Sequence, residues 1–352
     1  MTIRPSSFQK LILNWFDKHG RKHFPWQHNK TPYRVWISEI MLQQTQVNTV
    51  IPYYQTFMQH FPDLKSLANA PLDQVLHLWA GLGYYTRARN LHRAAKMVME
   101  QFNGQFPDNL AAIQTLPGIG PSTAGAIFSI ALNQPAAILD GNVKRVLARF
   151  QGIAQSIKDK NTVDELWKWA KHYIPSKRCA DYTQAMMDIG ATVCTRSNPQ
   201  CNLCPLNKHC IAYHQNMTHL IPVKQATKTL PVRTATFLIL QHKGQVLLHK
   251  RPPMGIWGGL WSFPEIAGEP VNENIRTYCK QQLKLDVHPF NLLPSFRHTF
   301  SHYHLDIHPA IIPVKRLPIR IMEDELQIWY NPDEPKSLGL PKPIQVIMRE
   351  LK

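Results

Sequence analysis

Four cysteines occupy one short segment with the spacing C-x6-C-x2-C-x5-C, and this feature restricts the fold of the chain more than any other. They are Cys194, Cys201, Cys204 and Cys210. Structural zinc usually takes two C-x2-C pairs that lie far apart in the sequence. Four thiolates packed this closely suit a [4Fe–4S] cluster better than zinc or unliganded thiols. Residues 194–210 are therefore predicted to form an iron–sulfur loop.

The N-terminus and the remaining cysteines indicate a reducing compartment. Met1 to Ser7 leads straight into an amphipathic helical pattern without the apolar segment of a secretory signal. We therefore expect a cytoplasmic protein, in which disulfides are rare, and Cys179 and Cys279 are interpreted as ordinary buried thiols. Since no apolar run approaches the roughly 20 residues that span a bilayer, we expect no membrane partner. We also expect a monomer.

The chain divides into two halves of different character. Over residues 6–213 apolar side chains recur at helical spacing, and Pro or Gly marks each break. A polar stretch follows at 215–233 and is predicted to be a linker. The first half, residues 1–214, is thus predicted to be an all-α domain.

The second half, residues 234–352, begins as a sheet. Thr234–Gln241 and Gln245–His249 are β-prone runs around a short loop that contains Gly244, which is typical of a hairpin. Asn272–Leu283 has a helical pattern, and His302–Ile312 alternates as a strand does. The predicted fold class of this half is α+β.

A glycine-rich hairpin at Leu116–Ala126 is a candidate phosphate site. Gly118 and Gly120 let the backbone turn so that amides at the next helix N-terminus can face an anion. Such a loop grips a DNA phosphate without reading sequence, although an ordinary turn between helices has the same pattern. The net charge of +17, from 40 Lys and Arg against 23 Asp and Glu, favours nucleic acid over other polyanions.

Two carboxylic acids stand in unusual surroundings. Asp140 precedes a helical pattern and is by itself best interpreted as an N-cap. Glu39 interrupts an apolar helix that starts at Thr31-Pro32, on one stripe with Gln43 and Gln46. Glu39 can be a structural, hydrogen-bonded residue or an acid whose protonated form is favoured by burial. Together the two suit cleavage at C1′ of a sugar, with Glu39 as the acid and Asp140 as the anion.

The hairpin, the aspartate and the cysteine loop together resemble the helix-hairpin-helix DNA glycosylases of the endonuclease III superfamily. Trp36–Thr45, which reads WISEIMLQQT, and Gly83-Tyr84-Tyr85 resemble the MutY-type adenine DNA glycosylases more narrowly. The resemblance covers nearly the whole chain. It implies a hydrolase of base excision repair that binds double-stranded DNA and removes adenine mispaired with 8-oxoguanine or guanine, after the base is flipped out.

The resemblance also implies roles for individual residues. Glu39 matches the residue that protonates adenine, and Asp140 the residue that stabilises the resulting cation. Gln44 and Tyr84 match residues that wedge into the base stack. The positions around the extruded adenine and the aspartate are matched by Trp26, Asn142 and Gln184. The predicted DNA-contact set is completed by Gln43, Gly118, Gly120, Ser122 and Lys144.

Ser122 bears on the type of reaction. Bifunctional relatives carry a lysine nucleophile at this position of the hairpin, and a hydroxyl cannot form a Schiff base. A monofunctional glycosylase is therefore predicted, with Lys144 as a possible occasional trap for the opened sugar. A pyrimidine-specific lyase of the endonuclease III kind is disfavoured by Ser122 and by the second domain. A non-catalytic iron–sulfur DNA-binding module is disfavoured by the Glu39 and Asp140 pair.

The second domain resembles a Nudix fold but departs from its metal-binding pattern. Gly259 and Glu265 fit the opening of the Nudix box, whereas Glu273-Asn274 and Thr277-Tyr278 stand where its acidic pairs belong. Without clustered carboxylates Mg²⁺ is not held, so nucleotide hydrolysis is not expected. In MutY-type enzymes the second domain senses 8-oxoguanine, and the matching loop here is Phe300, Ser301 and His302. Taken without the resemblance, these three residues read as the start of a strand.

Overall fold

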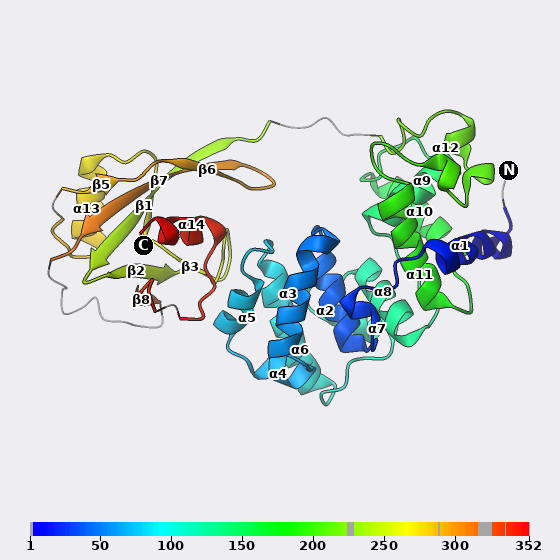
Figure 1. Ribbon diagram of the computed structural model, residues 1–352, viewed down its shortest axis with the longest axis horizontal. Coiled ribbons are helices and arrows are strands. Elements are labelled where there is room, and N and C mark those ends of the chain that lie inside the picture. Colours follow the sequence, from blue (N-terminus) through cyan, green and yellow to red (C-terminus); the bar gives the residue numbers. More distant parts are fainter. Residues whose placement is uncertain (1–2, 224–228, 288, 316–325, 335, 352) are drawn as a thin grey trace. The chain divides into compact units, whose positions relative to one another are not determined.

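A computed structural model describes residues 3–351 except 224–228, 288, 316–325 and 335, so part of the predicted linker lies outside the described residues. Contacts divide the chain into two units. The first, called the helical unit below, contains the described residues up to 69 and from 90 to 223, and the second contains residues 70–89 and the described residues from 229 onward, so the boundary falls inside the predicted linker. Figure 1 shows helices up to the linker and a sheet with two helices after it.

The part of the chain before the linker is helical, which confirms the predicted all-α character. Its α-helices are α1 (Pro5–His19), α2 (Pro32–Leu42), α3 (Val47–His60), α4 (Leu64–Asn69), α5 (Leu72–Trp79), α6 (Thr86–Gln101), α7 (Leu110–Thr115), α8 (Pro121–Leu132), α9 (Gly141–Gln151), α10 (Lys160–His172), α11 (Cys179–Asp188) and α12 (Ile211–His214). Short 3₁₀ turns lie at Pro25–Gln27, Cys201–Leu203 and Asn207–His209, and a π-helical turn at Ile189–Val193. No helix in the described part of the chain is both long and apolar enough to cross a membrane.

The stripe that was predicted along one helix is interrupted. Thr31 caps α2 as expected, and its side chain accepts a hydrogen bond from the backbone N–H of Arg34. The helix ends at Leu42, however, and Gln43 and Gln46 flank a turn before α3. The chain can turn there because Gln44 adopts the left-handed conformation, with φ of 56°. Glu39 thus remains on α2, whereas the glutamines belong to the turn.

Helix α8 forms the centre of the helical unit and is made of small and apolar residues. It packs against α2 and α11, and its buried residues include Ala124, Gly125 and Ala126. A Cβ added at Gly125 would collide with the carbonyl oxygen of Ala137, so the glycine lets the extended segment before α9 lie against α8. This close approach sets the position of Asp140, the N-cap of α9.

The residues after the linker form a mixed sheet with helices, as the predicted α+β class requires. The strands are β1 (Val232–His242), β2 (Gln245–Lys250), β3 (Trp261–Ser262), β4 (Glu265–Ala267), β5 (Asn291–Leu292), β6 (Phe296–Thr299), β7 (His304–Pro313) and β8 (Gln327–Tyr330), and the helices are α13 (Asn272–Gln282) and α14 (Lys342–Glu350). The main path runs β3-β2-β1-β7-β5, while β4 pairs with β1, β6 with β7 and β8 with β2. The β1–β2 hairpin and α13 confirm the sequence predictions, and β7 begins two residues later than expected.

One parallel pair lies at the centre of the sheet. Strands β1 and β7 run parallel, with Phe237 opposite Pro309, whereas the other pairings are antiparallel. Strand β1 is buried from Ala235 to Leu240 without alternation, which is typical of a strand covered on both faces. Helix α13 covers one face through Ile275 and Cys279, in one apolar cluster with residues of β1 and β7 (Figure 1).

Gly125→Ala is expected to lower the free energy of unfolding of the helical unit by about 1–3 kcal/mol, because the added methyl group meets rigid backbone. Gly141→Ala, at the first residue of α9 where a Cβ meets nothing within 4 Å, is the matched control and should be neutral or slightly stabilising. Thermal unfolding of the three proteins measures the difference. Equal melting temperatures for the two variants would contradict the packing of Ala137 against α8.

Candidate functional site

A cavity of about 210 Å³ in the helical unit is lined by seven of the predicted site residues, including both candidate catalytic carboxyl groups. A protein cavity of about 150 Å³ can hold benzene, so this one has room for a larger flat ring. The predicted site residues that line it are Trp26, Glu39, Gln43, Ser122, Asp140, Asn142 and Gln184. The predicted residues Gln44, Gly118, Gly120 and Lys144 are not among the residues that line the cavity.

Glu39 reaches the cavity from the last turn of α2. In the described part of the chain no cation pairs with its carboxyl group. Burial, and secondarily the charge of Asp140, raises the pKa of Glu39 to about 7. A carboxyl group with this pKa still carries its proton on a large share of molecules at neutral pH, so it can act as an acid.

Asp140 is held at the N-terminus of α9. Its Oδ1 accepts a hydrogen bond from the backbone N–H of Val143 at 2.8 Å, and its Oδ2 accepts one from Nδ2 of Asn142 at 3.4 Å. Burial raises the pKa of Asp140, while these hydrogen bonds and the charge of Arg145 act in the opposite direction. The N-cap interpretation is therefore confirmed, and the cap also aims a fixed carboxylate at the cavity.

The glycine hairpin orients the start of α8. Gly118 has φ of 82°, and a Cβ there would lie 2.9 Å from Cβ of Asn90, so glycine is needed for both the turn and the packing. Ser122, on the first turn of α8, accepts a hydrogen bond through Oγ from the backbone N–H of Leu139 at 2.9 Å. This bond ties α8 to the residue before Asp140. Sequence reasoning missed it, because the two residues come together only in the folded chain.

Two candidate wedge residues sit on left-handed backbone. Gln44 of the helical unit has φ of 56° and an exposed side chain. Tyr84, which belongs to the second unit, has φ of 50° and a side chain that is 48% exposed. Non-glycine residues in this conformation are uncommon and cluster at functional sites. Each side chain is thus displayed on a constrained turn.

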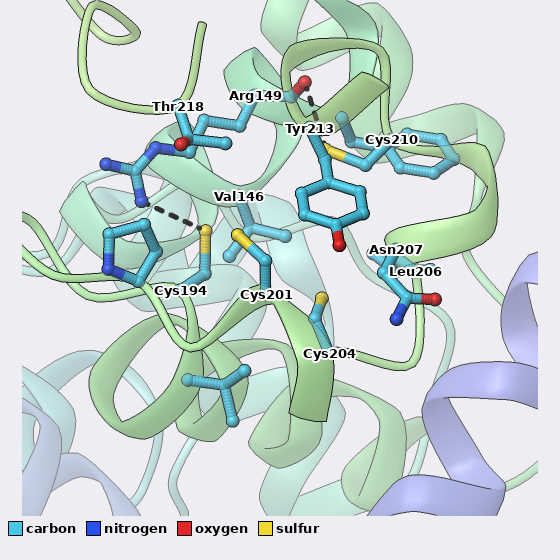
Figure 2. Close-up of a pocket in the computed structure, with 13 residues that line it drawn as sticks. Val146, Arg149, Cys194, Cys201, Cys204, Leu206, Asn207, Cys210, Tyr213 and Thr218 are labelled. Carbon is cyan, nitrogen blue, oxygen red and sulfur yellow. Dashed lines mark hydrogen bonds between the residues drawn. The ribbon is translucent and has the colours of Figure 1, made fainter. Parts of the chain in front are cut away.

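The four cysteines of the predicted iron–sulfur loop line one small cavity (Figure 2). Burial raises the pKa of the Cys204 thiol to about 12 and that of Cys210 to about 11. Among the described residues no three Cys, His, Asp or Glu side chains form a group that could hold one metal ion. The two remaining cysteines, Cys179 and Cys279, are buried elsewhere, as predicted.

A buried arginine fastens the cysteine loop to α9. The side chain of Arg149 is only 2% exposed. Its Nε donates to the carbonyl of Ile221 at 2.7 Å, and its Nη1 donates to the carbonyl of Thr195 at 2.7 Å. The same Nη1 also donates to Sγ of Cys194 at 3.3 Å (Figure 2). One turn earlier, Nε of Arg145 donates to the carbonyl of Cys194 at 2.7 Å. The loop is therefore attached to the helix that carries Asp140 at its start.

A second cavity lies wholly within the second unit and is lined by Tyr84 together with Phe300, Ser301 and His302. The last three residues form the turn between β6 and β7, rather than the start of a strand. The Phe300 ring stacks on Tyr303 with centroids 4.7 Å apart. Ser301 and His302 are exposed at the tip of the turn and offer hydrogen-bonding groups.

The two acidic residues at the Nudix-like positions, Glu265 and Glu273, have different surroundings. The carboxylate of Glu265 accepts hydrogen bonds from both terminal nitrogens of Arg251, at 2.8 and 2.9 Å. Glu273 lies exposed in the first turn of α13. A guanidinium on Glu265 satisfies that carboxylate without a metal ion.

Two family models match the chain. The model of the HhH-GPD superfamily base excision DNA repair proteins matches residues 37–172, and that of the NUDIX domain matches residues 235–350. The match to the adenine DNA glycosylase of Buchnera aphidicola subsp. Acyrthosiphon pisum is 43% identical over 345 residues, and covers 98% of this chain and 97% of that protein.

More distant proteins are similar as well. The adenine DNA glycosylase of Homo sapiens is 34% identical over 359 residues, which covers 85% of this chain and 66% of the human protein. Among solved structures, a thermostable thymine-DNA glycosylase is similar with a TM-score of 0.55 and 29% identity. That match covers 60% of this chain and 97% of the other.

Glu39→Gln is expected to raise the melting temperature at pH 8 more than at pH 5. A carboxyl group whose pKa rises on folding, here from 4.5 to about 7, destabilises the fold progressively as pH rises through that interval. The amide does not ionise and escapes this cost. Glu165→Gln, on an exposed position of α10, is the control for loss of a carboxylate. Equal shifts for Glu39→Gln at both pH values would show that Glu39 is not desolvated.

Proposed function

The chain belongs to the adenine DNA glycosylases, the DNA N-glycosylases of base excision repair, and on this premise we propose that it releases adenine paired with 8-oxoguanine or guanine. The observation that carries the proposal is the cavity of the helical unit, which Glu39 and Asp140 line from different environments. A base inside a duplex is out of reach of such a cavity, so the adenine must be flipped out of double-stranded DNA.

The two carboxyl groups divide the chemistry between them. Glu39 gives its proton to a ring nitrogen of adenine while the glycosidic bond breaks and its electron pair leaves with the base. Asp140 accepts hydrogen bonds that Glu39 lacks among the described residues, so it is the more readily ionised of the two. Its negative charge stabilises the cation that develops at C1′. Water then adds to this cation, and the proton that the water loses passes to the Glu39 carboxylate. Trp26, Asn142 and Gln184 surround the base and the aspartate.

The cavity favours base removal without strand cleavage. Among the described residues that line it there is no lysine, and Lys144 lies on α9 outside the lining. The Ser122 hydroxyl is engaged with the backbone before Asp140 and cannot form a Schiff base. We therefore assign a monofunctional reaction.

DNA contacts are assigned to both units. Gly118 and Gly120 present helix N-terminal amides to a phosphate, while Gln44 and Tyr84 wedge into the base stack. Phe300, Ser301 and His302 supply contacts to 8-oxoguanine. Since Glu265 is occupied by Arg251, the second unit acts in binding and not in nucleotide hydrolysis.

Asp140→Asn is expected to lower the single-turnover rate of adenine release by about 10²–10⁴-fold, because asparagine caps the helix equally well but carries no charge. Binding of the mispaired duplex should be largely retained. Asp159→Asn is the matched control, because Asp159 caps α10 in the same way and accepts from the backbone N–H of Thr162 at 3.0 Å. The rates are measured on duplexes with adenine opposite 8-oxoguanine and opposite guanine. Absence of adenine release from both duplexes by the unmodified protein would refute the proposed function.

We also assign a [4Fe–4S] cluster to Cys194, Cys201, Cys204 and Cys210. Support comes from the four thiols around one cavity and from their close spacing in the chain, which suits this cluster better than zinc. The basic side chain of Arg149 against Cys194 suits a site of negatively charged thiolates. When bound, the cluster would supply a cross-link that folds residues 194–210.

Protein purified without oxygen is expected to contain about four iron and four sulfide per chain, as this cluster type requires. Cys204→Ser should lose iron and the visible absorption of the cluster. Cys179→Ser, at a buried thiol outside the loop, should keep both. One zinc per chain without sulfide would instead assign the loop to zinc.

A further inference from the structure

A third buried carboxylate, that of Asp188, lies behind two residues that line the cavity of the helical unit. It ends α11, and its side chain is fully buried. An isolated buried charge is strongly unfavourable, so its partners decide its state. Arg21 supplies three hydrogen bonds: its backbone N–H donates to Oδ2 at 2.9 Å, and its Nε and Nη2 donate to Oδ1 at 2.9 and 2.7 Å.

The same carboxylate fixes the orientation of a cavity residue. Nε2 of Gln184, one helical turn before Asp188, donates to Oδ1 at 3.0 Å. An ionised carboxylate only accepts hydrogen bonds, so Gln184 must turn its NH₂ group toward Asp188. Its carbonyl oxygen is then the free edge of the amide, and the described residues offer that oxygen no donor. Gln184 and Arg21 line the cavity, whereas Asp188 does not.

We propose that Asp188 is a positioning residue for base selection: by holding the NH₂ group of Gln184, it makes the cavity wall present a hydrogen-bond acceptor to the base. The proposal rests on the proposed binding of adenine in this cavity. Adenine carries an exocyclic amino donor, and hypoxanthine carries a carbonyl acceptor at the same ring position. The carbonyl oxygen of Gln184 can accept a hydrogen bond from the amino group of adenine, whereas it repels the carbonyl oxygen of hypoxanthine. A buried polar group left without a partner is costly, and binding sites discriminate between ligands in this way.

A purely structural role for Asp188 makes a different prediction. If Asp188 only ties the segment around Arg21 to α11, its loss slows the release of every base in proportion. If it fixes the Gln184 amide, its loss changes the ratio between bases. The informative quantity is therefore the adenine-to-hypoxanthine ratio of single-turnover release rates, with each base opposite the same partner.

Asp188→Asn is the test variant. An asparagine side chain both donates and accepts hydrogen bonds, so it allows the Gln184 amide to rotate by about 180° and exchange its oxygen and its NH₂ group. We expect the ratio to fall about tenfold or more, which corresponds to about 1.4 kcal/mol. Thr183→Val is the matched control, because Thr183 lies next to Gln184 on α11. This substitution removes a buried hydrogen bond of 2.6 Å between Thr183 and Ser129 of α8. It should lower the melting temperature and leave the ratio unchanged.

Arg21→Gln combined with Asp188→Asn removes both charges and keeps the proposal testable if the single variant does not fold. A ratio within twofold of the unmodified protein, in whichever variant folds, would overturn the role of Asp188. Failure of the unmodified protein to release adenine would instead contradict the proposed function.

Discussion

The desolvation of carboxyl groups is the constraint around which the helical unit is arranged. Three of them lie in or behind one cavity, and each is compensated differently. Asp188 is neutralised by Arg21, Asp140 receives hydrogen bonds at a helix N-terminus, and Glu39 has neither kind of partner among the described residues. The result is a carboxylate paired with an arginine, a carboxylate that caps a helix and a carboxyl group whose pKa is about 7.

Helix α9 connects this cavity to the cysteine loop. It begins at Asp140, and its Arg145 and Arg149 side chains bind backbone carbonyls of the loop. A cross-linked loop would therefore hold α9, and so hold the carboxylate that caps it. The packing of α8 against residues 137–139 also holds Asp140 in place.

A glycosylase has to break a bond without leaving its own charges unpaired in the absence of substrate. Among the described residues, the carboxyl group without a charged partner is also the one whose pKa is raised to about 7, because desolvation favours the protonated form. The amide of Gln184 adds direction to the same cavity, since a buried anion decides which of its two polar ends is exposed. The charge, the protonation state and the hydrogen-bond polarity of these groups thus depend on burial and on neighbouring side chains.

By itself the sequence determined the two fold classes, the position of the hairpin, the N-cap at Asp140 and the four-cysteine loop. These follow from spacing along the chain: the 3.6-residue period, the Pro and Gly breaks, and thiols that are close in sequence. It also pointed to Glu39, because a carboxylate among apolar residues of one helix is visible locally. The continuous stripe through Gln43 and Gln46 was wrong, since the turn at Gln44 depends on a backbone conformation that residue type does not reveal.

Tertiary structure alone decided which distant residues meet. The pair of Arg21 and Asp188 joins positions 167 residues apart, and the bond from Leu139 to Ser122 joins the segment before Asp140 to the first turn of α8. Neither has a local signature, because hydrogen bonds between remote segments depend on how helices pack. The pKa of Glu39 likewise depends on its burial and on the charge of Asp140, and these two residues belong to different helices, α2 and α9. The spacing of residues along the chain thus indicated the candidate site residues. The packing of the helices determined the hydrogen-bond partners and the pKa of each.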